Sequence, residues 1–138
     1  ANFDEAILLN YDGTVSEGSG ENLFMVRNGE IITPTETDNC LLGITRDSII
    51  DIAQNELGMT VIERQIHRSE LYLADEVFLT GTAAHVTSVG SLDNRKIGEG
   101  KIGKITKSLQ DLYFSIVIDD EKISKRKDYS EWLTSFKI

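Results

Sequence analysis

The chain has 138 residues, which is enough for one domain and nearly excludes two of ordinary size. Its 14 Lys and Arg against 23 Asp and Glu leave a formal net charge of -9, which argues against nucleic acid or an anionic membrane as a partner. Hydrophobic residues make up 40% and charged residues 27%, so a buried core is expected and disorder is not. The single Cys40 excludes an internal disulfide and no apolar run is long enough to span a membrane, so we expect a cytoplasmic protein.

The N-terminal part predicts a buried strand followed by a hairpin. Residues 5–10 form a short apolar run that Tyr11-Asp12-Gly13 closes as a turn. Residues 22–27 and 30–33 are strand-like and flank Asn28-Gly29, a dipeptide typical of two-residue hairpin turns. We therefore expect these two strands to pair with each other.

An amphipathic helix is predicted over residues 46–57, where apolar residues recur at helical spacing. Thr45 is its expected N-cap and Gly58 its expected end. A strand over residues 60–64 follows, and then a short helical turn that starts near Ser69.

The C-terminal part predicts two strands and a long helix. The strands cover residues 76–80 and 86–92, and Gly81 breaks the first of them. Asp93-Asn94 forms the turn after the second strand. Residues 102–118 form the helix, because their apolar side chains fall on one face at helical spacing.

This order of elements predicts a single α+β domain over residues 1–138, because strands are mixed with helices without regular βαβ alternation. We expect a curved mixed sheet with flanking helices. Residues 119–131 are rich in charged side chains, and we expect them to be flexible.

The segment Ser-Glu-Gly-Ser-Gly-Glu-Asn at residues 16–22 is a candidate ligand-binding loop between two strands. Its glycines let the backbone come close to a ligand, and two carboxylates flank them. An ordinary surface loop has the same composition, and on composition alone that is the more frequent interpretation.

Two other segments could bind an anion. Residues 43–47 open the amphipathic helix, where free amides and the positive end of the helix dipole attract negative charge. Asp47 could instead simply complement that dipole. Residues 80–84 offer further amides and hydroxyls, although a tight turn between strands explains them equally well.

The two histidines, His67 and His85, have no cysteine or carboxylate at ligand spacing, so we expect no bound metal and no catalytic histidine. Lys101, Lys104 and Lys107 cluster at the start of the last helix, where a solvated face is expected rather than an amine with a shifted pKa.

Together and in this order, several segments resemble the class IV aminotransferases, the fold type IV enzymes that use pyridoxal 5'-phosphate (PLP). The likeness runs from about Asp4 to Phe114 and is carried by residues 16–22, 43–47, 70–76, 81–84 and 100–107. Residues 81–84, Gly-Thr-Ala-Ala, are most similar to the members that act on branched-chain amino acids. The resemblance implies the larger C-terminal domain of such an enzyme, with a pseudo-barrel sheet, and transamination between Leu, Ile or Val and 2-oxoglutarate.

The resemblance also implies roles for individual residues. Glu17 would keep the pyridine nitrogen of the cofactor protonated, so that the ring draws electrons from the substrate. The amides of Ile44 and Thr45, together with Thr82, would hold the cofactor phosphate. The amides of Thr82 and Ala83 would receive the substrate carboxylate, while Gly18 on the substrate side and Gly20 on the cofactor side leave room beside the ring.

The Schiff-base lysine of the family matches no residue of this chain and is expected upstream of Ala1, as is the small N-terminal domain. No catalytic residue is therefore assigned here, and the chain alone is expected to be inactive. The family also implies a homodimer or a larger even assembly. His85 and Ser88 depart from the usual family pattern, which has Glu and Pro at the corresponding places.

Three alternatives stay open on sequence. The enzyme could be a D-amino acid aminotransferase or an aminodeoxychorismate lyase, which belong to the same class. A module that binds a phosphate-bearing ligand without catalysis would keep the anion site and lack the lysine.

Overall fold

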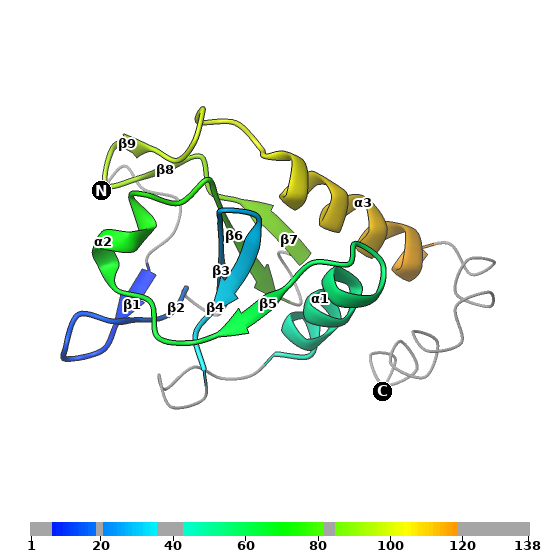
Figure 1. The fold of residues 1–138 in the computed structure, drawn as a ribbon, viewed down its shortest axis with the longest axis horizontal. Helices are drawn as coiled ribbons and strands as arrows, with labels where there is room; N and C mark the ends of the chain where they lie inside the picture. Colours follow the sequence, from blue (N-terminus) through cyan, green and yellow to red (C-terminus); the bar gives the residue numbers. More distant parts are fainter. Residues whose placement is uncertain (1–6, 19–20, 36–42, 82–84, 119–138) are drawn as a thin grey trace.

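A five-stranded mixed sheet forms the centre of the computed structural model, which describes residues 7–18, 21–35, 43–81 and 85–118. Its strands lie in the order β5-β4-β3-β6-β7, and only the β4–β5 pair is parallel. The bounds are β3 Asn22–Arg27, β4 Glu30–Thr33, β5 Val61–Glu63, β6 Glu76–Gly81 and β7 His85–Ser88. Figure 1 shows this sheet with the helices beside it. The mixed sheet, the β3–β4 hairpin and the strands β5 and β6 confirm the sequence-based expectations.

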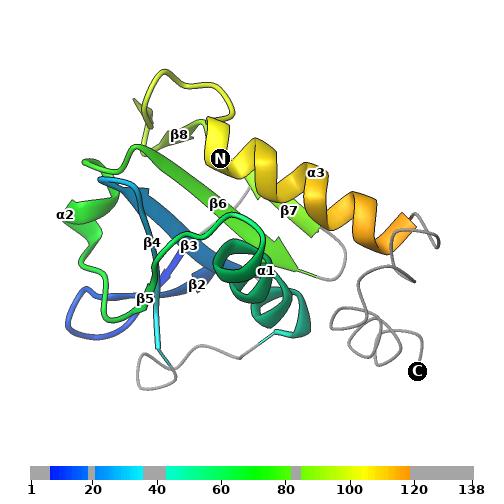
Figure 2. The same ribbon diagram turned by 45° about the vertical axis from the view of Figure 1, so that its right-hand side comes forward.

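The parallel pair arises because helix α1, Ile44–Asn55, connects β4 to β5. Parallel neighbours need such a crossover, since a tight turn can join only antiparallel strands. The other helices are α2, Arg68–Leu71, and α3, Lys104–Ile118. Helices α1 and α3 lie side by side against one side of the sheet (Figure 2).

Strand β2, Val15–Gly18, corrects one prediction, because the first half of segment 16–22 is strand rather than loop. It pairs antiparallel with β1, Ile7–Leu9, after the predicted turn, in which the Thr14 amide donates to Asp12 Oδ1 at 3.0 Å. Val15 is fully buried and anchors the strand. The backbone pairing with β1 and the burial of Val15 stabilise β2, although its composition of Ser, Glu and Gly is unfavourable for strands.

The predicted single strand over residues 86–92 is also wrong, since it consists of β7 in the main sheet and β8, Ser91–Leu92, in another. Strand β8 pairs with β9, Arg95–Lys96, around the predicted Asp93-Asn94 turn. The φ angles of +50° and +63° at these two residues are those of a tight hairpin turn. Residues 91 and 92 therefore pair with β9 in this local hairpin and do not continue β7 in the main sheet.

Helix α1 starts earlier than expected, with Gly43 as its N-cap, so Thr45 lies inside the first turn and the prediction of a Thr45 cap is wrong. Gly43 lies close to β3, because a Cβ on it would lie 2.6 Å from Oδ1 of Asn22. A side chain at residue 43 would therefore require the Asn22 side chain to move. The helix ends ahead of Gly58, as predicted.

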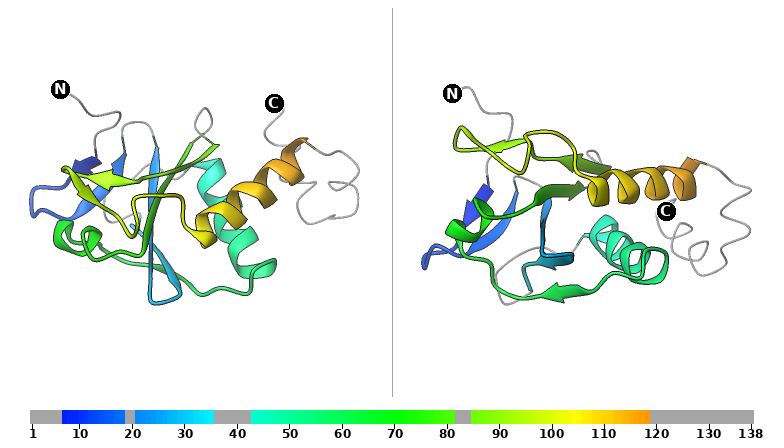
Figure 3. Two further views of the ribbon diagram at one scale, coloured as in Figure 1. Left: turned by 90° about the horizontal axis from the view of Figure 1, so that it is seen from above. Right: turned by 45° about the horizontal axis from the view of Figure 1, so that its top comes forward.

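Two hydrophobic clusters lie on the two faces of the sheet, because side chains alternate along β3 and β6. Phe24 and Phe78 point toward α1 and α3, whereas Leu23 and Leu79 point to the face covered by α2 and the β1–β2 pair. Figure 3 shows this layered arrangement from two further sides. In α3 the predicted apolar face is confirmed, since Leu109 and Ile116 are fully buried and Ile105 and Leu112 pack against the same cluster.

The carboxylate of Glu76 holds the start of α3. Its Oε1 accepts hydrogen bonds from the amide and hydroxyl of Thr106 at 2.8 and 2.7 Å, and its Oε2 accepts one from the Ile105 amide at 3.2 Å. Gly103 makes room for this carboxylate, because a Cβ there would lie 2.1 Å from Cδ of Glu76. The negative charge also complements the helix dipole.

We expect Glu76→Ala to destabilise the full-length protein by about 2 kcal/mol, because buried amides lose a charged acceptor. Chemical denaturation measures the change. Asp111→Ala is the matched control on the same helix: Asp111 forms an exposed ion pair with Lys107 at 3.0 Å, which is worth about 0.5 kcal/mol or less. Equal effects of the two substitutions would contradict the proposed role of Glu76.

Candidate functional site

The start of α1, the start of β3 and the end of β6 meet in one buried place. Asn22 and Thr80 are register partners on the adjacent strands β3 and β6, and both are buried. They continue the row of Phe24 and Phe78, so their side chains lie on the face of the sheet that α1 covers. Gly43 lies directly against the Asn22 side chain.

Two hydroxyls in this region are buried without a hydrogen-bond partner in the described part of the chain. They are Oγ1 of Thr45, in the first turn of α1, and Oγ1 of Thr80. A buried hydroxyl without a partner costs about 1–3 kcal/mol. Such groups are therefore typical of a place where a polar ligand completes the hydrogen bonding.

Among the residues that the structure describes, no side chain caps the first turn of α1. The first amides of a helix have no partner within the helix and attract anions together with the dipole. Ile44 opens the helix and is half-exposed, and its carbonyl accepts a hydrogen bond from Ser48 Oγ at 2.9 Å. Free amides beside a buried hydroxyl form a donor set suited to a phosphate.

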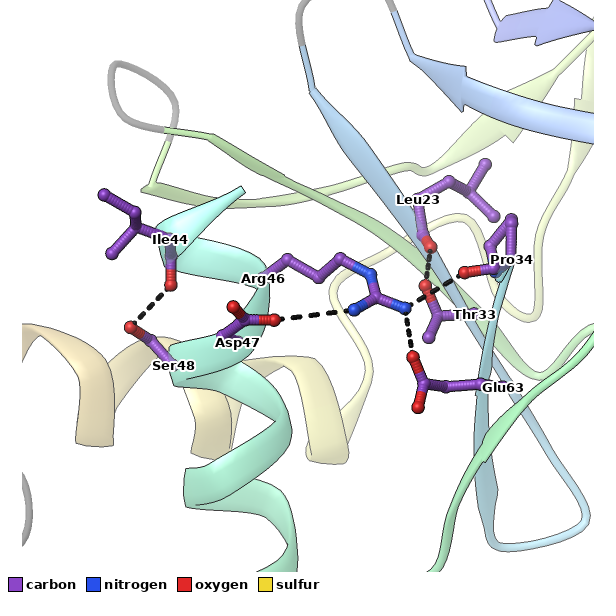
Figure 4. Close-up of polar contacts among 8 residues, drawn as sticks. All are labelled: Leu23, Thr33, Pro34, Ile44, Arg46, Asp47, Ser48 and Glu63. Carbon is purple, nitrogen blue, oxygen red and sulfur yellow. Dashed lines mark hydrogen bonds and ion pairs between the residues drawn. The ribbon is translucent and has the colours of Figure 1, made fainter. Parts of the chain in front are cut away.

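Arg46 follows these residues in the first turn and is 2% exposed. Its Nη2 donates to the carbonyl of Pro34 at 3.0 Å and to Oε1 of Glu63 at 2.7 Å, and Nη1 lies 3.5 Å from Oδ1 of Asp47 (Figure 4). The side chain thus ties the helix start to the residue after β4 and to the end of β5.

The residues that the resemblance assigned are only partly described. Glu17 and Gly18 lie in β2, opposite Leu8 and Ile7 of β1; the Glu17 side chain lies outside what the structure describes. Gly20, Thr82 and Ala83 also lie outside the described residues. Their assigned roles, and that of Glu17, stay predictions.

Strands β6 and β7 nevertheless fix the place where residues 82–84 are attached, because Gly81 and His85 are register partners at the end of the pair. Thr80 immediately precedes this point. His85 has a φ of +56°, and its ring contacts those of Tyr113 and Phe114 in α3.

Segment 70–76, which contributes to the family resemblance, has a structural role in the described region. Glu70 accepts from Arg64 Nη2 at 2.9 Å and from the His67 amide at 3.3 Å. Burial raises the pKa of Glu70, but these hydrogen bonds outweigh it and hold the pKa below its usual value. Asp75 accepts from the Asn28 amide at 3.0 Å, and Glu76 holds α3.

The lysines of the last helix confirm the predicted solvated face, since Lys101, Lys104 and Lys107 are exposed. His67 caps α2. Within residues 7–18, 21–35, 43–81 and 85–118, no three His, Cys, Asp or Glu side chains gather as metal ligands. No helix in the same ranges is long and apolar enough to cross a membrane.

The sequence placed Asn22 and Thr80 only within the candidate segments 16–22 and 80–84, and it did not single out either residue. Asn22 begins β3 and Thr80 is the second-last residue of β6, and the hydrophobic residues of both strands are buried on both faces of the sheet. Because both faces of these strands are buried, no alternation of polar and apolar residues marks the two positions in the sequence.

Comparison with known proteins places this arrangement in a family. The model of the family described as amino-transferase class IV matches residues 1–92. The chain belongs to the class IV aminotransferases, which confirms the resemblance carried by its sequence segments.

Individual relatives of the chain support the same family assignment. The probable branched-chain-amino-acid aminotransferase of Aquifex aeolicus is 56% identical over 132 residues, covering 96% of this chain and 41% of that relative. The branched-chain-amino-acid aminotransferase of Escherichia coli (strain K12) is 49% identical over 114 residues, covering 83% of this chain and 37% of that relative. The chain thus spans about two fifths of the length of the curated relatives it matches.

Solved structures agree with the fold. A branched-chain amino acid aminotransferase complexed with N-(5'-phosphopyridoxyl)-L-glutamate has a TM-score of 0.84 and 46% identity, covering 94% of this chain and 42% of the other. The Escherichia coli branched-chain amino acid aminotransferase has a TM-score of 0.81 and 49% identity, covering 83% and 38%.

Proposed function

We propose that this chain forms the larger, cofactor-binding C-terminal part of a PLP-dependent aminotransferase that moves amino groups between Leu, Ile or Val and 2-oxoglutarate. The observation that carries the proposal is the uncapped start of α1, where the buried Thr45 hydroxyl lacks a partner among the described residues. The names of the relatives, branched-chain-amino-acid aminotransferases, support the substrate class. The glutamate conjugate in the similar solved structure supports glutamate and its oxo acid as the second pair.

The residues present fit a phosphorylated cofactor. The amides of Ile44 and Thr45 and the Thr45 hydroxyl would hold the phosphate, with Thr82 as a further donor. When bound, PLP supplies an electron sink for the bond changes at the substrate's α-carbon. Glu17 would hold a proton at the pyridine nitrogen, the amides of Thr82 and Ala83 would orient the substrate carboxylate, and Gly18 and Gly20 would leave room beside the ring.

The remaining parts of the proposal concern the full-length protein. A catalytic lysine and the small domain would come from the sequence before Ala1, the sheet would complete a pseudo-barrel, and the assembly would be a homodimer or a larger even oligomer. The share of the relatives that the chain covers, about two fifths, supports a larger whole. The cytoplasmic location is also part of this proposal.

The test uses the purified full-length protein with PLP. We expect glutamate to form from 2-oxoglutarate with Leu, Ile and Val, measured by a coupled glutamate assay. Turnover of D-alanine instead would indicate the D-amino acid enzyme, and pyruvate release from aminodeoxychorismate would indicate the lyase. PLP binding without any turnover would indicate the non-catalytic module.

A pair of variants ties this result to the described site. Thr45→Val keeps the side-chain shape and removes the buried hydroxyl, so we expect PLP to bind about tenfold more weakly, which corresponds to one hydrogen bond to a charged group. Ser48→Ala is the control, because Ser48 Oγ already donates to Ile44 O. Equal PLP affinity for Thr45→Val and wild type would remove Thr45 from the site.

A further inference from the structure

Arg46 carries its charge in an unfavourable place. It is the third residue of α1, and its side chain is almost completely buried. The first turn of a helix is the positive end of the dipole, where cations are disfavoured. Burial adds a desolvation cost for a charged group. A cation is kept here only if other charges or hydrogen bonds compensate for it.

The acidic side chains that pair with Arg46 in the described region offset only part of the cost of burying its charge. Glu63 accepts from Nη2 at 2.7 Å, but its side chain is 54% exposed, and Asp47 is 61% exposed at 3.5 Å from Nη1. Water partly screens these two carboxylates, which weakens their interaction with the buried guanidinium. Nε of Arg46 is buried without a hydrogen-bond partner in the same part of the structure. A further negative charge near the start of α1 would therefore interact favourably with Arg46.

The contacts of Arg46 also hold the backbone around that start. Its bond to the Pro34 carbonyl joins the first turn of α1 to the end of β4 (Figure 4). The neighbouring Thr33 hydroxyl donates to the Leu23 carbonyl at 2.7 Å. Leu23 follows Asn22, which lies against Gly43. Arg46 thus holds the first turn of α1 to the residue after β4, and β4 is in turn held to β3 through Thr33.

We propose that Arg46 is a positioning residue for the cofactor phosphate: it fixes the direction of the first amides of α1 and adds positive potential where the phosphate binds. The inference rests on the proposed function. A phosphate monoester carries about -1.5 to -2 charges at pH 7. Its binding beside the first turn offsets both the helix dipole and the buried guanidinium, which explains why a cation is retained there.

The test compares PLP with pyridoxal, which lacks the phosphate, by equilibrium binding to the full-length protein. Arg46→Met keeps much of the side-chain length and removes the charge. We expect PLP to bind roughly tenfold more weakly while pyridoxal affinity changes less than about twofold, and we expect Arg46→Lys to recover part of the loss. A purely structural arginine would weaken both ligands by the same factor, or neither, and either result would overturn the inference.

Arg68→Met is the matched control, because Arg68 also lies in the first turn of a helix and pairs with Asp93 at 3.0 Å. It should leave both affinities unchanged, and a PLP-specific loss there equal to that of Arg46→Met would overturn the inference.

Glu63→Gln tests the proposed role of Arg46 if the Arg46→Met variant fails to fold. It keeps an acceptor for Nη2 and removes the counter-charge, so PLP should bind a few-fold more tightly. Unchanged or weaker PLP binding by Glu63→Gln would overturn the inference. A wild-type protein that binds neither PLP nor pyridoxal would overturn the proposed function, and this inference with it.

Discussion

Glu17→Gln in the full-length protein is expected to slow the first half-reaction with leucine roughly a hundredfold or more. The substitution keeps the shape of the side chain and removes the negative charge that would hold the pyridine nitrogen protonated. A loss of a few kcal/mol of transition-state stabilisation produces this effect, at about 1.4 kcal/mol per tenfold. Stopped-flow absorbance of the PLP-loaded protein measures the rate.

Folding should change little, because β2 pairs with β1 through its backbone at Glu17. We expect thermal unfolding to stay within about 0.5 kcal/mol of wild type. Glu99→Gln is the control, since Glu99 is an exposed carboxylate in the loop before α3, and it should alter neither rate nor stability. A normal rate for Glu17→Gln would show that Glu17 has no role in the reaction and remove the main residue-level argument for this chemistry.

Phe78→Ala should cause the largest loss of stability. Phe78 lies in β6, is fully buried, and stacks on Phe24 of β3 with ring centroids 4.9 Å apart and planes 2° from parallel. Truncating a buried phenylalanine costs about 3–5 kcal/mol, against a total of about 5–15 kcal/mol for a typical domain. Urea denaturation of the full-length protein measures the loss.

The control is Phe114→Ala, because Phe114 is 36% exposed on α3. Its ring contact with His85 should be worth no more than about 1.5 kcal/mol. Because Thr80 lies two residues from Phe78 on the same face of β6, we also expect Phe78→Ala to weaken PLP binding. Similar denaturation midpoints for the two variants would show that the Phe24–Phe78 pair is not central to the core.

The sequence by itself determined the local elements and the family. Asn28-Gly29 defined the hairpin, the helical spacing of apolar residues defined α1 and α3, and the mixture of strands and helices defined the mixed sheet. These features depend on turn conformation and on periodic burial, which neighbouring residues encode. The segments at residues 16–22, 43–47, 70–76 and 81–84 were specific enough, as an ordered set, to identify the class.

Only the tertiary structure decided where the helix and strand ends lie and which polar groups meet. The helix has Gly43 and not Thr45 as its N-cap, and Gly43 lies against the side chain of Asn22, which is 21 residues earlier in the chain. Strand β2 forms because β1 offers a partner, whatever the local composition. Packing between distant segments produces the buried charge of Arg46 and its contacts with Pro34 and Glu63. It also buries the hydroxyls of Thr45 and Thr80, which have no hydrogen-bond partner among the described residues. Such contacts carry no local sequence signal, since their energies arise from burial that exists only in the folded chain.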